Sequence, residues 1–243
     1  MNFGRNSLEP PAKSERVNLY LNIIAHEIRN PLVSIRGFTG LLREQCMEKL
    51  PNESVEYFQR IENSLSRAEG LLADISKLAQ IKINEANFIS TAVSDLVDAA
   101  MELHYVEIKK RKFNIKIFGN LPDLHCDADA MVMVFSNLIG NSIKYSQDNR
   151  IGEIEIGYLG DELFHKFFVR DNGVGFTSKE QKKIFLMFSR LRNKQKAQGS
   201  GIGLSLVKQV IEGHGGEIWA EGKKGRGSVF YFTMPKNSPV EIY

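Results

Sequence analysis

His26 is the residue in this sequence best placed to do chemistry. Glu27 follows it directly, and an imidazole beside a carboxylate is a nucleophile with an adjacent base, as acceptance of a phosphoryl group requires. Apolar residues around this pair alternate three and four apart, which predicts a helical heptad seam: Leu21, Ile24, Ile28, Ile35, Phe38 and Leu42. If Leu21 is position a, His26 is position f and faces away from the seam. We therefore expect an exposed imidazole, a position that an ordinary solvated histidine would also fit.

Pro31 and Asn30 follow the histidine in the same helical pattern. Pro31 removes a backbone hydrogen bond and clashes with the carbonyl group of residue 27, so we predict a kink beside His26. A helix end is the alternative, but the seam continues to Leu42. Asn30 is four residues after His26 and shares its helix face, unless it only precedes the proline at a local distortion.

Two later segments carry groups that suit a nucleotide. Asn137, Asn141 and Lys144 are four and three apart, so they form one helical stripe. Amide oxygens suit Mg²⁺, and a lysine one turn further on reaches a phosphate, although such a stripe is also typical of solvated surface. The second segment, Asp171 to Phe176, follows an apolar strand and offers a carboxylate with two glycines for a tight turn, or an ordinary turn alone.

Two more segments supply a cation and a run of glycines, one each. The run from Phe185 to Arg190 leads into a polar stretch of lid-like composition, and Arg190 would serve a phosphate; a helix docking its aromatic face is the alternative. The run from Gly199 to Leu204 opens a helix, where bare amides meet phosphate at the positive end of the helix dipole. Its spacing is neither that of a P-loop nor that of a dinucleotide-binding loop.

The elements that must position these residues fall into two parts. Residues 1–13 are expected to be a lead-in or linker. A helix from residue 14 to about 49 and the turn at 51–54 precede a second heptad helix, marked by Phe58, Ile61, Leu65, Ala68, Leu72, Ile75 and Ala79. Residues 14–84 are therefore expected to form an antiparallel hairpin, and two copies would pair as a homodimeric four-helix bundle.

Residues 85–236 change to short alternating runs and glycine-rich loops, which predicts a mixed domain, and 237–243 are a tail. Strands are expected at 114–118, 153–158, 166–170, 217–220 and 228–234. Helices are expected at 95–110, 129–145 and 204–212. This order predicts an α/β sandwich, one largely antiparallel sheet with helices on one face.

Composition limits the binding partners and the cellular compartment that we expect for this protein. Lys plus Arg 32 against Asp plus Glu 29 leaves +3, which demands neither nucleic acid nor anionic lipid. Cys46 and Cys126 have no metal-ligand spacing and no disulfide framework, so we expect a reducing, cytoplasmic setting. No run spans a bilayer and no signal-peptide core is visible, although a longer parent chain would be free to carry an anchor.

The segment from His26 to Leu32 resembles the H-box of sensor histidine kinases, and the four later segments resemble, in order, the N, G1, F and G2 boxes of their ATP-binding domain. Together the resemblance covers residues 14 to 236. It implies an ATP-binding domain of the GHKL (Bergerat) type, shared with gyrase, MutL and the ninety-kilodalton heat-shock chaperones. It also implies autophosphorylation of His26 by ATP, followed by transfer to an aspartate of a response-regulator receiver domain.

The same resemblance assigns roles in the nucleotide site. Asn141 would coordinate Mg²⁺ with support from Asn137, and Asp171 would accept a hydrogen bond from the adenine amino group. Lys144 and Arg190 would contact the phosphates, and Tyr145 would line the nucleotide pocket. Gly173 and Gly175 would shape that pocket. The lid would be framed by Gly199, Ser200, Gly201, Gly203 and Leu204.

In the ATP-hydrolysing relatives, the resemblance places a glutamate that activates water at the position of Asn137. An amide cannot act as a general base, so kinase chemistry is favoured over ATP hydrolysis. Asn30 matches the position at which many of these kinases have threonine or asparagine. The resemblance implies that this side chain helps to position water for dephosphorylation of the regulator, which predicts a phosphatase activity. Two alternatives remain: a degenerate nucleotide-binding dimeric scaffold, and an ATPase or serine kinase on this fold.

Overall fold

The computed structural model describes residues 13–46, 51–80, 83, 87–160, 162–187, 189 and 201–236. The chain divides into two compact units, Met1–Gln80 and Ile81–Tyr243, and each is described by itself. No helix among the described residues is long and apolar enough to cross a membrane.

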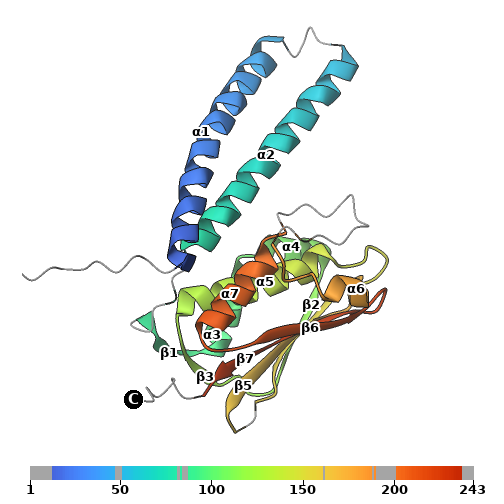
Figure 1. Cartoon of the computed structure of the whole chain (residues 1–243). Coiled ribbons are helices and arrows are strands. Elements are labelled where there is room, and N and C mark those ends of the chain that lie inside the picture. The colour runs from blue at the N-terminus through green and yellow to red at the C-terminus, as the bar shows by residue number, and fades with distance from the viewer. Residues whose placement is uncertain are drawn as a thin grey trace, which may run out of the picture. The chain divides into compact units, whose positions relative to one another are not determined.

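The first unit is a helical hairpin of α1 (Lys13–Cys46) and α2 (Asn52–Gln80) (Figure 1). Helix α1 runs without interruption through Pro31, so the alternative of a helix end at that residue is wrong. The expected end of α1 near residue 49 lies outside the described residues.

The helices of the hairpin pack through residues that recur every seven positions. In α1 these include the buried Ala25 and Thr39, and in α2 the buried Leu65, Leu72 and Ala79. The seam of α1 is different, because its side chains are between 45% and 67% exposed: Ile24, Ile28, Ile35, Phe38 and Leu42. Helix α1 therefore packs on α2 through heptad position e and leaves its own positions a and d uncovered within one chain, whereas α2 packs through seam residues.

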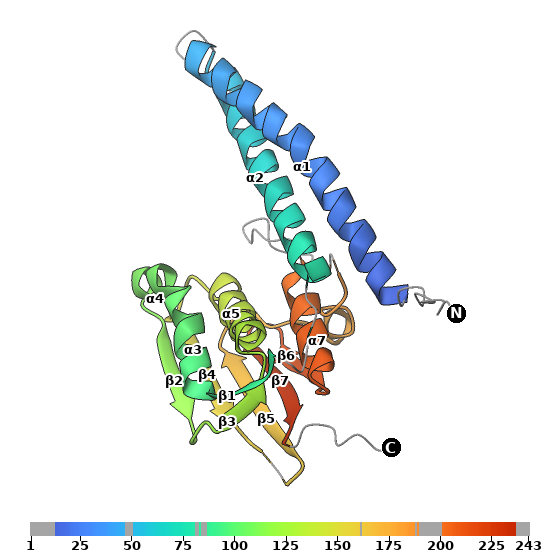
Figure 2. The ribbon, with the colours of Figure 1, turned by 90° about the vertical axis from the view of Figure 1, so that its left-hand side faces the viewer.

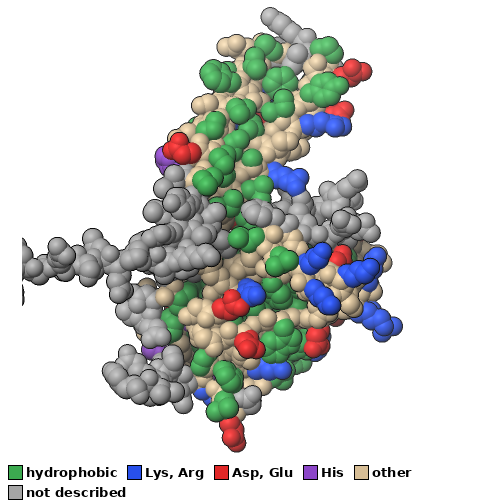
Figure 3. Space-filling view, viewed as in Figure 1, with side chains coloured by type: hydrophobic (Ala, Val, Ile, Leu, Met, Phe, Trp, Pro, Cys, Tyr) green, Lys and Arg blue, Asp and Glu red, His purple; other side chains and the backbone are tan. Residues whose placement is uncertain are grey.

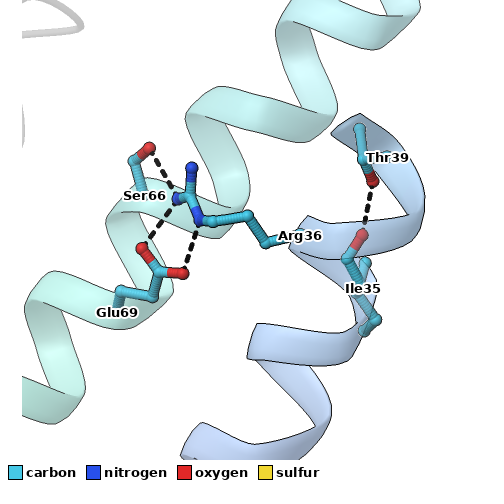
Figure 4. A network of polar contacts seen from close by, with 5 residues as sticks. All are labelled: Ile35, Arg36, Thr39, Ser66 and Glu69. Atoms are coloured by element: carbon cyan, nitrogen blue, oxygen red, sulfur yellow. Dashed lines mark hydrogen bonds and ion pairs between the residues drawn. The ribbon is translucent and has the colours of Figure 1, made fainter. Parts of the chain in front are cut away.

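Polar side chains fix the register of the two helices (Figure 4). Arg36 holds Glu69 with two bonds, Nε to Oε1 at 2.6 Å and Nη2 to Oε2 at 2.7 Å, and Nη2 also donates to Ser66 Oγ at 3.0 Å. Further along α1, Arg43 donates to Glu62 of α2 at 2.9 Å. Such paired geometry favours one alignment of the helices, although exposed ion pairs contribute little to stability.

The second unit is built on a five-stranded sheet of order β2-β4-β5-β7-β6. The strands are β2 (Asn114–Phe118), β4 (Glu153–Tyr158), β5 (Phe164–Asp171), β6 (Ile218–Lys223) and β7 (Gly227–Pro235). Only the pairing of β2 with β4 is parallel among these neighbours. A separate antiparallel pair, β1 (Ile89–Ala92) and β3 (Asp123–Cys126), was not anticipated from the sequence.

Helices α3 (Val93–Glu102), α5 (Ala128–Lys144) and α7 (Gly203–Gly213) lie on one face of the sheet (Figures 1 and 2). The core between the layers contains fully buried side chains from both, including Phe135 of α5, Phe167 of β5 and Phe232 of β7. The α/β sandwich expected from the sequence is thus confirmed.

One expected helix is wrong, because residues 95–110 form two helices, α3 and α4 (Tyr105–Arg111). The break falls at His104, whose φ of −116° and ψ of 13° leave the helical region. Its Nε2 lies 2.9 Å from the carbonyl oxygen of Ser136 and 3.0 Å from Ser136 Oγ on α5. This tertiary contact replaces helix continuation. A short α6 (Ser178–Gln181) completes the unit, with Thr177 and Glu180 forming a capping box.

The opposite face of the sheet carries a single cross-strand row of aromatic residues. Strand register aligns Phe118, Gly157, Phe168, Tyr231 and Trp219. Trp219 stacks on Tyr231 with ring centroids 5.4 Å apart, and Lys166 Nζ lies 4.9 Å from the Trp219 ring centroid. Cation–π contact and the lysine stem thus shield rings on the face that none of the described helices covers.

Candidate functional site

His26 lies on the outside of the hairpin, as the heptad pattern predicts. Its side chain is 67% exposed, and its Nδ1 is 3.6 Å from Glu27 Oε1. The preceding Ala25 is buried at 1% exposure, so the packing contact is made by the neighbouring helix face, about 100° around from His26. Asn30 is also exposed one turn later. An accessible imidazole with a carboxylate at ion-pair distance is suited to attack an incoming phosphoryl group.

Helix α5 carries the expected asparagine stripe. Its start is fixed by Asp127, whose Oδ1 accepts a hydrogen bond from the Ala130 amide at 3.0 Å. Asn137 Nδ2 donates to the Met133 carbonyl at 2.9 Å, which leaves its Oδ1 facing α7. A Cβ on Gly203 would lie 2.5 Å from that oxygen. The structure therefore brings the N-box and G2-box positions together.

Asn141 has an unusual environment one turn further on. Its Nδ2 is buried and has no hydrogen-bond partner among the residues described. A buried polar atom without a partner is costly, and its presence in a helix stripe facing the glycine segment fits a site completed by a ligand. Within the described ranges no group of three His, Cys, Asp or Glu side chains could hold a metal. A divalent ion here would thus depend on amide and phosphate oxygens, which suits Mg²⁺.

Asp171 ends β5 as a buried carboxylate with two internal donors. The Gly173 amide donates to Oδ1 at 2.7 Å, and Ser228 Oγ on the paired strand β7 donates to Oδ2 at 2.5 Å. Burial raises the pKa of Asp171, while these two donors and the positive charge of Arg150 act in the opposite direction. Each oxygen retains capacity for a further donor, so the carboxylate can recognise an amino group.

The G1 glycines allow three backbone segments to approach closely. A Cβ on Gly173 would lie 2.6 Å from the carbonyl oxygen of Tyr145, the residue that ends α5. Gly175 has a φ of +59°, and a Cβ there would lie 2.1 Å from the Lys223 carbonyl oxygen. Neither position accepts a side chain without backbone movement. Lys144, next to Tyr145, places its Nζ 5.0 Å from the Tyr145 ring centroid.

The glycine-rich segment is described from Gly201 onward, whereas Arg190, Gly199 and Ser200 lie outside the described residues. Gly201 has a φ of +77°, and Gly203 is the first residue of α7. The N-cap residue is Ile202, whose apolar side chain cannot cap the helix. Leu204 packs against the core and anchors this helix start. The first amides of α7 are thus placed as a helix N-terminus that favours an anion.

Sequence reasoning missed three residues near Asp171. Ser228 is brought to Asp171 only by the register of β5 and β7, and Gln147 and Arg150 donate to the backbone of the G1 segment. The position of Gln147 and Arg150 directly after the N-box was the one signal available in the sequence. Their contacts depend on tertiary structure, which a single sequence does not reveal.

Comparisons with known proteins agree with this geometry. Residues 17–82 match the family described as His Kinase A (phospho-acceptor) domain, and residues 126–238 match Histidine kinase-, DNA gyrase B-, and HSP90-like ATPase. The methanogenesis regulatory histidine kinase FilI of Methanothrix harundinacea is 31% identical over 230 residues, which are 93% of this chain and 25% of that protein. Sensor histidine kinase WalK of Bacillus subtilis is 27% identical over 90% of this chain and 36% of its own length.

A solved structure is similar across both units. Histidine kinase ThkA in complex with response regulator protein TrrA has a TM-score of 0.64 and 25% identity, covering 92% of this chain and 64% of that one. The chain spans about a quarter to a third of the lengths of FilI and WalK. The chain consists of a phospho-acceptor hairpin followed by an ATP-binding domain, which together form the catalytic core of a histidine kinase. It therefore belongs to the histidine kinase family.

Proposed function

We propose that this core transfers the γ-phosphoryl group of ATP to His26 and then to an aspartate of a response-regulator receiver domain. The observation that carries the proposal is the exposed imidazole with Glu27 at 3.6 Å, in a chain that also carries an ATP-binding domain. Phosphoryl transfer depends mainly on positioning and charge neutralisation. Glu27 would take the imidazole proton, and the charge of the phosphates would be neutralised in the nucleotide site. Because ATP is the donor, we assign the reaction to the cytoplasm.

In the nucleotide site, Asp171 would accept a hydrogen bond from the adenine amino group, with Gly173, Gly175 and Tyr145 shaping the pocket around it. Lys144 and Arg190 would contact the phosphates. The segment from Gly199 to Leu204, with Ser200, Gly201 and Gly203, would frame the lid. The support is the buried carboxylate with unused acceptor capacity and the close backbone approach at both G1 glycines.

Asn141 would hold Mg²⁺, with Asn137 supporting it. Mg²⁺ would neutralise charge on the β- and γ-phosphates. The amide of Asn137 is fixed by its bond to the Met133 carbonyl, and it has no group that accepts a proton from water. Water would thus remain unactivated beside the nucleotide, which favours transfer to His26 over ATP hydrolysis.

The regulator would dock on the hairpin near His26, where Asn30 shares the exposed face. The similar kinase ThkA is described as a complex with a response regulator, which supports this partner. We further propose that Asn30 positions water for dephosphorylation of the regulator.

A homodimer would cover the exposed seam of α1. Figure 3 shows hydrophobic side chains following the hairpin along the face in view. A groove of about 510 Å³ between the helices is lined by residues that include Leu32, Ile35 and Ile61. Burial of apolar surface is the main driving force for helix association in water. A second hairpin that covers these side chains would complete a four-helix bundle.

The test is incubation with γ-labelled ATP and Mg²⁺. We expect acid-labile, alkali-stable label on the wild type, none on His26→Ala, and full label on the control His125→Ala, which removes an exposed histidine of the other unit. Label retained on His26→Ala would refute the acceptor. ATP binding without label would indicate the scaffold, phosphate release without label an ATPase, and acid-stable label a serine kinase.

The second test is a phosphotransfer profile against candidate receiver domains. Asn30→Ala should retain autophosphorylation and transfer but lose regulator dephosphorylation. An equal loss of autophosphorylation and dephosphorylation would contradict the separate role of Asn30.

A further inference from the structure

Two side chains that follow α5 donate hydrogen bonds to the same pair of backbone carbonyl groups. Gln147 Nε2 lies 2.8 Å from the Gly173 oxygen and 3.2 Å from the Gly225 oxygen. Arg150 Nη2 lies 3.1 Å from the Gly173 oxygen and 3.3 Å from the Gly225 oxygen, and it also donates to the Asn172 carbonyl. We call Gln147 and Arg150 the carbonyl clasp. Their shared acceptors indicate a built contact between separate segments.

The carbonyl clasp joins the two backbone segments that position the carboxylate of Asp171. One is the G1 segment, in which the Gly173 amide donates to Asp171 Oδ1. The other is the turn between β6 and β7, where the Gly225 amide donates to the Val174 carbonyl at 2.7 Å. That turn leads into Ser228, which donates to Asp171 Oδ2. Displacement of either segment would move one donor of the carboxylate.

Arg150 also acts on Asp171 through its charge. Burial raises the pKa of Asp171, the Ser228 hydroxyl and the amides of Gly173 and Ser228 lower it, and Arg150 is the charged side chain that lowers it among the described residues. Because a carboxylate accepts two donors at each oxygen and a protonated acid donates instead, adenine recognition depends on keeping Asp171 ionised.

We propose that Arg150, with Gln147, is a positioning residue for adenine specificity: it fixes the two backbone segments around Asp171 and supplies the positive charge beside it. The inference rests on the proposed role of Asp171 as acceptor for the adenine amino group. It adds a residue outside the five boxes to the recognition of the base.

The test compares binding of ADP and IDP to residues 1–243 by calorimetry, because IDP lacks the adenine amino group and neither nucleotide donates a γ-phosphoryl group. Arg150→Gln should weaken ADP about tenfold at pH 7.5 and leave IDP nearly unchanged, so that the preference for ADP falls. Its ADP affinity should also decline at a higher pH than in the wild type as pH is lowered. Arg150→Lys should keep the wild-type pH profile, since it keeps the charge, but recover only part of the affinity.

Arg226→Gln is the matched control, because Arg226 is an exposed arginine in the same turn as Gly225. Equal ADP affinities in Arg150→Gln and Arg226→Gln would overturn the inference. Equal losses of ADP and IDP with an unchanged pH profile would also overturn it, because they indicate a structural role alone. Asp171→Asn separates the two proposals: if it keeps the ADP preference, the role of Asp171 fails, and if only Arg150→Gln keeps it, the clasp inference fails alone.

Discussion

Replacement of Asp171 by asparagine should stabilise the ATP-binding unit while removing adenine recognition. Asp171 is 7% exposed, and burial raises the pKa of its carboxyl group. Asparagine has nearly the same shape, retains an oxygen for the Gly173 amide and offers an amide group to the Ser228 hydroxyl. The variant thus removes a buried charge while keeping the packing of the side chain and the hydrogen bond from the Gly173 amide.

The sign of the stability effect follows from proton linkage. An acid whose pKa is higher in the folded protein binds more protons there than in the unfolded chain, so the free energy of unfolding falls as pH rises through the window above the ordinary value of 3.8. At pH 7.5 the wild type carries the full cost of the charge. We expect Asp171→Asn to have a higher free energy of unfolding, and so a higher melting temperature, than the wild type at pH 7.5. The gain should vanish near pH 4.

The binding effect has the opposite sign. Loss of a hydrogen bond to a charged acceptor costs about 1.5–3 kcal/mol, which weakens ADP binding about 10- to 150-fold. Thermal unfolding without nucleotide and calorimetric titration with ADP measure the two effects separately. A variant that is less stable at pH 7.5 would show that the carboxylate is structural. A variant with wild-type ADP affinity would refute its role in recognition of the base.

Three further predictions concern the other parts of the molecule. Phe38→Glu should convert the dimer to a monomer in analytical ultracentrifugation, because Phe38 is a seam residue that is 67% exposed in one chain. The control Val33→Glu, at position f, should leave the dimer intact, and a monomeric wild type at micromolar concentration would contradict the bundle. Gly203→Ala should weaken ADP binding at least tenfold with little change in apo melting temperature, because the new Cβ would displace the Asn137 amide; unchanged affinity would refute this placement. Burial lowers the pKa of His214, so the unfolded chain binds more protons below the ordinary value of 6.5 and the melting temperature should fall from pH 7 to pH 5; an equal fall in His214→Gln would assign it to other groups.

The sequence predicted the regular elements with the strongest periodicity. Expected strands at 114–118 and 153–158 are β2 and β4 without change, and the helix expected at 129–145 is α5 within one residue at each end. These elements have an uninterrupted alternation or helical stripe, so local pattern and tertiary structure agree. The β1 and β3 strands were missed, and the pairing that holds them, Ile89 with Cys126, is a long-range contact that local pattern does not contain.

The remaining features depend on contacts between distant residues. The break at His104 follows from its bond to Ser136, 32 positions away, and local propensity does not contain that information. The same holds for Ser228, which reaches Asp171 across 57 positions through strand register. The boxes were visible because each is local. The residues that hold them in place were not.

The aromatic row on the open face of the sheet makes the molecule report on its own unfolding. Trp219 is the only tryptophan in the sequence, and it lies on β6, stacked on Tyr231 of β7. Its fluorescence therefore monitors the ATP-binding unit alone, whereas helical circular dichroism reports on the hairpin together with the helices of that unit. If hairpins associate, the dichroism transition shifts with protein concentration and the fluorescence transition does not. One unlabelled sample thus yields two spectroscopic signals: fluorescence belongs to the ATP-binding unit, and helical dichroism belongs to both units.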